Sequence, residues 1–140
     1  MRRGGRALGA GLALVLALMA CADRASFGGG SFAAIERAIR REGLHVCSTR
    51  TLVLANEAIA GRAYRVALRC RSDDDVQLVA DEFASKAARD AAASALEGQV
   101  RPRADGAVWT FGRFAISIDG ARDTEVEDRL VDALERLGAR

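Results

Sequence analysis

The sequence lacks the residues and motifs on which most enzymes depend. It has one histidine and one proline among 140 residues, and it contains no G-x-S-x-G, no HExxH and no phosphate-binding glycine loop. The adjacent acids Asp81 and Glu82 fall in a predicted strand, where neighbouring side chains point to opposite faces and so do not share a substrate. We therefore predict that the chain is not an enzyme and uses no cofactor.

The overall composition excludes several other classes of protein. Half of the residues are apolar and 29% are charged, a balance typical of a globular chain and unlike that of disordered, collagen-like or multi-span membrane proteins. A length of 140 residues is close to the usual size of one domain. We therefore expect one hydrophobic core and no second domain.

The amino-terminal residues have the pattern of a signal peptide. Arg2, Arg3 and Arg6 precede residues 7–20, an uninterrupted run of fourteen Ala, Leu, Gly, Val and Met residues. As a helix this run would extend about 21 Å, which is shorter than the roughly 30 Å hydrocarbon core of a bilayer. The segment is therefore better explained as a cleaved leader than as a permanent membrane span.

The tetrapeptide Leu18, Met19, Ala20 and Cys21 follows this run and resembles the lipobox of bacterial lipoproteins. The resemblance covers the first 21 residues and implies cleavage between Ala20 and Cys21 and acylation of the Cys21 thiol, with Met19 tolerated rather than typical at its position. An ordinary secretory signal or an uncleaved anchor is the alternative. We predict an extracytoplasmic protein that is held at a membrane by the lipid on Cys21. The sequence does not indicate which membrane this is.

Removal of residues 1–20 changes the charge of the chain. It takes three of the 21 basic residues and none of the 19 acidic ones, so the mature chain has a net charge of −1. A nucleic-acid partner is therefore not expected. Both methionines, Met1 and Met19, leave as well, which excludes a methionine-rich copper carrier.

Cys47 and Cys70 are the other two cysteines of the mature chain, and an extracytoplasmic compartment is oxidising. Each falls in a strand-like segment, so we predict that they form a disulfide between neighbouring strands, with Cys70 facing the core. A catalytic Cys47 with His45, or a metal site of His45, Cys47 and Cys70, is the alternative. No CxxC, second histidine or fourth ligand supports either one, and we expect no metal and a half-buried His45.

The mature chain divides into a short tether and one domain. Residues 21–30 hold the lipidated cysteine and a glycine-rich tether, and residues 31–140 form the domain. A helix is capped by Ser31, has Phe32, Ile35 and Ile39 on one face, and ends at Gly43. Residues 50–62 show no clear period.

Hydrophobic alternation and capping signals predict the remaining elements. The predicted strands are Leu44–Thr49, Ala63–Cys70, Val76–Phe83, Ala107–Phe111 and Phe114–Ile118. An alanine-rich helix follows Ser85 over Lys86–Glu97, with Ala88, Ala91, Ala92, Ala95 and Leu96 on its apolar face, and stops at Gly98. A last helix begins near Thr124, buries Val126, Leu130, Ala133, Leu134 and Leu137, and closes at Gly138.

These elements predict an α+β fold in the order αβββαββα. We expect three helices on one face of a mostly antiparallel sheet of about five strands, a two-layer sandwich. The aromatic residues Phe83, Trp109, Phe111 and Phe114 are expected in its core. The run Asp73, Asp74 and Asp75 lacks the spacing of a calcium loop and is predicted to be a solvated turn.

The expected role is a binding or structural module of the cell envelope, because a small lipidated domain needs only a surface to act as a partner. We expect the partner to be an envelope protein or peptidoglycan, and a small extracytoplasmic enzyme is the alternative function. From Val76 onward the chain is similar to the sporulation-related (SPOR) repeat, which binds peptidoglycan, in V-Q-L, in Phe83-Ala84-Ser85 and in Phe111-Gly112-Arg113-Phe114. This similarity points to the face around Gln77, but the predicted strand at Phe114–Ile118 departs from the family pattern.

Overall fold

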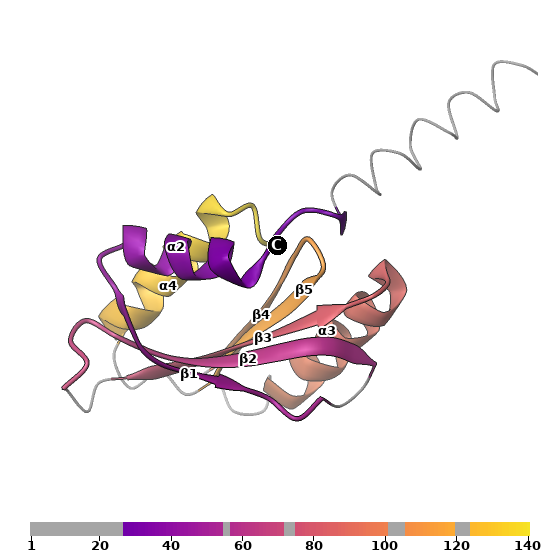
Figure 1. Ribbon diagram of the computed structural model, residues 1–140, viewed down its shortest axis with the longest axis horizontal. Helices are drawn as coiled ribbons and strands as arrows, with labels where there is room; N and C mark the ends of the chain where they lie inside the picture. The colour runs from indigo at the N-terminus through magenta and orange to yellow at the C-terminus, as the bar shows by residue number, and fades with distance from the viewer. Residues whose placement is uncertain (1–26, 55–56, 72–74, 101–105, 120–123) are drawn as a thin grey trace, which may run out of the picture.

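A computed structural model of the chain describes residues 27–54, 57–71, 75–100, 106–119 and 124–140. The described residues form three helices and five strands. The helices are α2 (Phe32–Arg41), α3 (Lys86–Val100) and α4 (Thr124–Arg136). The strands are β1 (His45–Thr51), β2 (Ala58–Ala67), β3 (Val76–Phe83), β4 (Gly106–Phe111) and β5 (Phe114–Asp119). The predicted α+β class and element order are confirmed (Figure 1).

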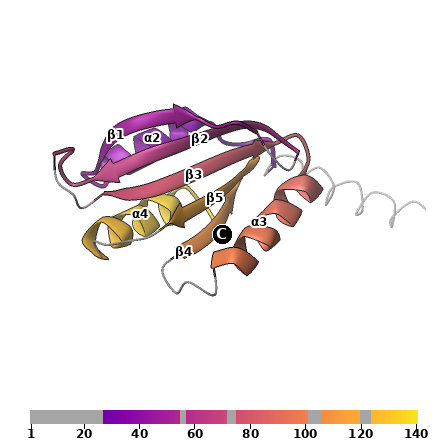
Figure 2. The same ribbon diagram turned by 90° about the horizontal axis from the view of Figure 1, so that it is seen from below.

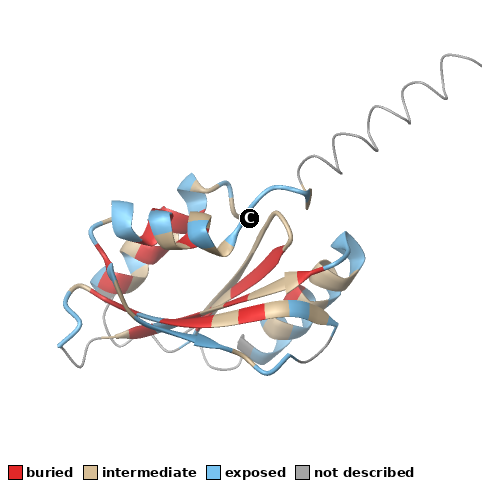
Figure 3. Cartoon of the chain, viewed as in Figure 1, coloured by how far each residue is buried: buried red, intermediate tan, exposed pale blue. Residues whose placement is uncertain are grey.

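The five strands form one antiparallel sheet in the order β1-β2-β3-β5-β4. A β-bulge interrupts the β1–β2 pairing between Val46 and Ser48, and it leaves Cys47 as the extra residue. A second irregularity lies between Ala58 and Ala60 in β2. β1 and β4 are the edge strands, and Figure 3 shows β1 as mostly exposed.

Helices α2 and α4 pack together over one face of the sheet, where they enclose the main hydrophobic core. Ser31 caps α2 by accepting a hydrogen bond from the Ala34 amide at 3.1 Å, and Gly43, with a φ of +74°, follows its end. The predicted apolar stripes of both helices are confirmed. They supply to the core Ile35, Ile39, Val126, Leu130 and Leu134, all of them fully buried.

Helix α3 lies on the opposite face of the sheet, so the expectation that all three helices share one face is wrong (Figures 1 and 2). On β5, Phe114 belongs to the core beneath α2, whereas its neighbour Ala115 packs with Phe83 and with Ala93 of α3. β3 and β5 thus carry apolar side chains on both faces. The part of this second face that α3 does not cover, over β1 and β2, is open.

Three other predictions differ from the structure in detail. β2 begins at Ala58 and ends at Ala67, so Cys70 lies beyond the strand and is exposed instead of facing the core. Helix α3 continues through Gly98 to Val100. Its buried alanine is Ala93, whereas Ala91 and Ala95 are exposed.

The end of the predicted tether packs against the turn between β4 and β5. Gly112, with a φ of +53°, lies so close to Gly29 that a β-carbon there would come within 1.5 Å of the Gly29 carbonyl oxygen. The Arg89 guanidinium lies 5.6 Å from the centre of the Phe27 ring and donates a hydrogen bond to the Gly112 carbonyl. The chain therefore enters the domain at this turn.

Candidate functional site

The predicted signal peptide, its cleavage site at Ala20 and Cys21, and the predicted lipidation of Cys21 lie outside the described residues. Phe27, the first described residue, follows Cys21 by six positions. None of the helices in the described ranges is long and apolar enough to cross a bilayer.

The sulfurs of Cys47 and Cys70 lie at disulfide distance, and their Cα atoms are 5.1 Å apart. Cys47 is half-buried at the bulge of β1, and His45 is exposed instead of half-buried. Both sulfurs are used by this pairing, so neither the catalytic nor the metal-binding alternative gains support. Within the described ranges, no three His, Cys, Asp or Glu side chains form a group suited to a metal ion.

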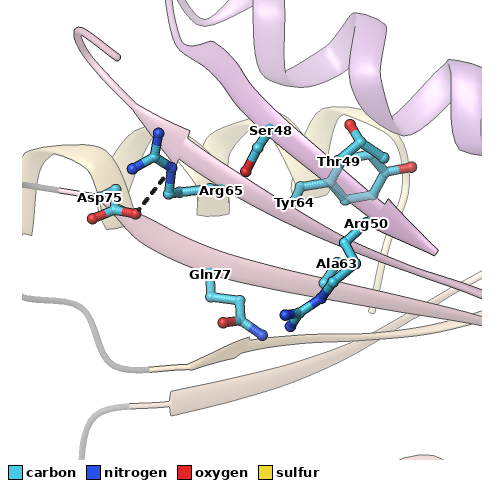
Figure 4. A pocket seen from close by; sticks show the side chains of 8 residues that line it. All are labelled: Ser48, Thr49, Arg50, Ala63, Tyr64, Arg65, Asp75 and Gln77. Atoms are coloured by element: carbon cyan, nitrogen blue, oxygen red, sulfur yellow. Dashed lines mark ion pairs between the residues drawn. The ribbon is translucent and has the colours of Figure 1, made fainter. Parts of the chain in front are cut away.

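A shallow depression of about 400 Å³ lies on the open face of the sheet, over β1, β2 and β3 (Figure 4). Its lining residues are Ser48, Thr49, Arg50, Ala63, Tyr64, Arg65, Asp75 and Gln77. Ala63, which is buried, leaves room for the hollow because its side chain is small. Gln77, the residue to which the SPOR similarity pointed, therefore lies at this depression.

The polar groups of this depression are mostly exposed. Arg65 forms an ion pair with Asp75 at 3.5 Å, and Asp75 is the one residue of the Asp73–Asp75 run that the structure describes. Arg50 has no ion-pair partner within the described part of the chain. An exposed pair of this kind contributes little to stability, so Arg65 can exchange Asp75 for an anionic or hydroxyl-rich ligand, which Arg50 can also meet.

A second, smaller depression of about 170 Å³ lies between α3 and the end of the β1–β2 hairpin. It is lined by Leu52, Val53, Asp81, Phe83, Ala92, Ala95, Leu96 and Gln99. Asp81 is the only charged residue in this lining. Sequence reasoning missed this site, although Asp81, which follows the apolar residues Leu78, Val79 and Ala80 in one strand, was a usable signal.

The carboxylate of Asp81 is half-buried among apolar groups. A β-carbon at Gly61 would lie 2.5 Å from Asp81 Oδ1, 3.4 Å from Leu52 Cβ and 3.5 Å from Leu54 Cδ2, so these atoms surround one small space. Burial raises the pKa of the Asp81 carboxyl above its usual value. Within the described residues the carboxylate has no hydrogen-bond or ion-pair partner.

Glu82 faces the other side of the sheet, as the sequence predicts for neighbours in a strand. It pairs with Phe114 across the β3–β5 ladder, whereas Asp81 pairs with Ala115. Glu82 also lies 3.5 Å from Arg113 in an ion pair. The two acids therefore do not act on one substrate together.

Exposed apolar side chains gather beside the Asp81 depression. The large hydrophobic residues exposed in the described ranges are Val53, at 98%, Leu54, at 45%, and Ile59, at 47%. All three lie at the end of the β1–β2 hairpin, and Val53 also lines the depression. We call Leu52, Val53, Leu54 and Ile59 the hairpin patch.

The aromatic residues belong to the hydrophobic core, as predicted. Phe83 and Phe114 are buried, and Trp109 and Phe111 are partly buried against the main core. The Phe114 ring meets the Phe32 ring edge to face at 4.9 Å. Their packing explains these residues without a ligand.

The predicted strand that departs from the SPOR pattern is present as β5. Comparisons with protein-family models, with curated proteins and with solved structures find no match to this chain.

Proposed function

We propose that this chain is a lipid-anchored extracytoplasmic module that docks onto another protein of the cell envelope through the hairpin patch. The observation that carries the proposal is the exposure of Val53, which lines the hollow, and of Leu54, which lies near the Gly61–Asp81 contact. Large exposed apolar side chains that gather in one place are typical of protein interaction sites. A hollow beside them gives a partner side chain a place to be buried.

The anchor is supported by the lipobox resemblance and by the short distance between Cys21 and the folded domain. The six residue steps from Cys21 to Phe27 span at most about 22 Å, since an extended chain covers roughly 3.3–3.6 Å per residue. A lipid on Cys21 would therefore hold the β4–β5 turn close to the membrane. Metabolic labelling with a palmitate analogue is expected to mark the wild-type chain and not Cys21→Ala, and an unlabelled wild type would contradict the anchor.

Docking is tested by site-specific photocrosslinking in cells. A benzophenone amino acid replaces Val53 or Leu54 in the full-length chain, and exposed Glu135 on α4 serves as the control position. We expect both patch positions to give an adduct with the same envelope protein, and the control to give none. Adducts shared with the control, or an adduct joining two copies of this chain, would contradict the proposal.

The depression over Ala63 supports a second candidate function, the binding of peptidoglycan across the open sheet face. Its arginines and the amide of Gln77 suit a polymer that carries carboxylates and hydroxyl groups. Co-sedimentation with purified peptidoglycan tests it. If this function holds, the wild-type chain sediments and the Arg50→Ala, Gln77→Ala double variant does so at least several-fold less, whereas a wild type that stays in solution removes this candidate.

A further inference from the structure

We infer that Asp81 is the recognition point for a basic side chain, an arginine flanked by apolar residues on the partner polypeptide. This inference rests on the proposed docking function and names the chemistry of the partner. The hairpin patch would contact the apolar flanks, and the depression beside α3 would take the cationic group.

The Asp81 carboxylate destabilises the free protein. The carboxylate is half-buried beside Gly61 in a depression that Leu52 also lines, and no described residue pairs with it. A buried charge without a partner is unfavourable, and the raised pKa of Asp81 reflects the same effect. A cation on the partner would remove this penalty, and its removal would make the free energy of binding more favourable.

The depression around Asp81 has a mostly apolar lining. Apart from Asp81, the lining consists of apolar side chains and the amide of Gln99. An apolar wall excludes water when a partner docks, and the exclusion strengthens the attraction between the carboxylate and a cation. An apolar or acidic side chain in the same place would leave the carboxylate unpaired, and a neutral donor would give a hydrogen bond without the attraction between opposite charges.

The depression also has room for a cationic group beside Gly61. The missing side chain at Gly61 leaves the space in which Asp81 Oδ1 lies. A guanidinium is planar and offers several N–H donors, so it can bind both oxygens of one carboxylate together. About 170 Å³ is enough for the end of one such side chain and too little for a larger ligand.

The test uses the purified full-length mature chain in mild detergent and a set of fluorescent seven-residue peptides. Each peptide has leucines around a central arginine, and each has a twin in which neutral citrulline replaces the arginine. Fluorescence anisotropy is expected to show at least tenfold tighter binding of the arginine peptides, as expected for a charge-assisted hydrogen bond. In Asp81→Asn this difference in affinity should disappear. The double variant Val53→Ser, Leu54→Ser should weaken the binding of both peptide sets.

The outcomes separate this inference from the function on which it rests. Equal binding of both peptide sets, still weakened by Val53→Ser, Leu54→Ser, would overturn cation recognition and leave docking through the patch intact. Binding of neither set, or arginine-dependent binding that Asp81→Asn does not change, would also overturn it. So would a dimer of the purified chain that Asp81→Asn dissociates, because the cation would then come from a second copy. Finally, an Asp81 pKa below its usual value in the free protein, measured by NMR, would reveal an existing cationic partner.

Discussion

The carboxylate of Asp81 occupies space that any side chain at Gly61 would need, since a β-carbon at Gly61 would lie 2.5 Å from Oδ1. The two residues face each other across the β2–β3 ladder. A glycine in the middle of a strand is unfavourable, and an unpaired half-buried carboxylate is also unfavourable. Gly61 and Asp81 are thus both unfavourable for stability, and they contact each other. This combination indicates a role other than stability, in agreement with the proposed recognition of a cation.

Replacement of Asp81 by asparagine is expected to stabilise the protein. The amide has the same shape without the charge, so the free energy of unfolding at pH 7 should rise by about 1 kcal/mol. The gain should depend on pH. Because the folded-state pKa of Asp81 is raised, its penalty is complete above that pKa, declines as the pH falls toward 3.8, and is absent below it.

Urea unfolding of wild type and Asp81→Asn at pH 7 and at pH 4 measures this prediction, with Trp109 fluorescence as the probe. Asp132→Asn on the exposed face of α4 is the matched control, and its effect should stay within about 0.5 kcal/mol. A loss of stability in Asp81→Asn at pH 7 would mean that the carboxylate already has a favourable partner.

The contact between Gly61 and Asp81 predicts strong coupling in a double-mutant cycle. Gly61→Ala should lower the free energy of unfolding of the wild type by roughly 1–3 kcal/mol, because the new methyl group clashes with the carboxylate. In an Asp81→Ala background the same change should be neutral, or stabilising by roughly 0.5–1 kcal/mol, since alanine is favoured over glycine in a strand. An equal cost of Gly61→Ala in both backgrounds would show that the two residues do not share this space.

Most of the fold could be predicted from the sequence because apolar residues recur there at the spacing of a helix or a strand. β3 spans Val76–Phe83, as predicted, because a polar turn precedes Val76, and Ser85, which caps the next helix, follows Phe83. The stripes of α2 and α4 were equally clear. By contrast, the first part of β2 is made of Ala58, Ile59, Ala60 and Gly61, and small residues next to a bulge give no alternation to detect.

The side of the sheet that α3 covers could not be predicted, because alanines occur on every side of this helix and no face is clearly more apolar than the others. Ala93 is buried while Ala91 and Ala95 are exposed, a distinction that depends on the position of the sheet. The Asp81 depression was missed for a related reason. It is formed by α3 and the hairpin end together, and neither segment shows by itself that they meet around an acid.

Loss of the predicted disulfide is expected to cost about 3 kcal/mol of stability. Cys47 and Cys70 are separated by 23 positions, and closing a loop of this length restricts the unfolded chain. The double variant Cys47→Ala, Cys70→Ala should therefore unfold at lower urea concentration than the wild type. Adding a reductant should shift the wild type toward the variant and leave the variant unchanged. A wild type that is insensitive to reductant in the unfolding transition would contradict the prediction.

Tyr64→Phe is expected to stabilise the protein, although Tyr64 is fully buried in the main core. No described residue forms a hydrogen bond of good geometry with the Tyr64 hydroxyl, although the Glu36 and Arg62 side chains lie close enough for weaker hydrogen bonding to affect its pKa. Removing an unsatisfied buried hydroxyl should raise the free energy of unfolding by about 1 kcal/mol at pH 7. A loss of that size in urea unfolding would show that the hydroxyl is satisfied.

The same residue predicts how the protein responds to alkali. Burial, and next the negative charge of Glu36, raise the pKa of Tyr64 from 10.0 to about 12. As the pH rises from 10 toward 12, the unfolded chain loses this proton while the folded chain keeps it, so stability falls through that range. Tyr64 is the only tyrosine, so absorbance at the phenolate band titrates it alone. We expect a midpoint near 12 in the folded protein and a smaller alkaline loss of stability in Tyr64→Phe, whereas a midpoint near 10 would mean that solvent reaches the hydroxyl.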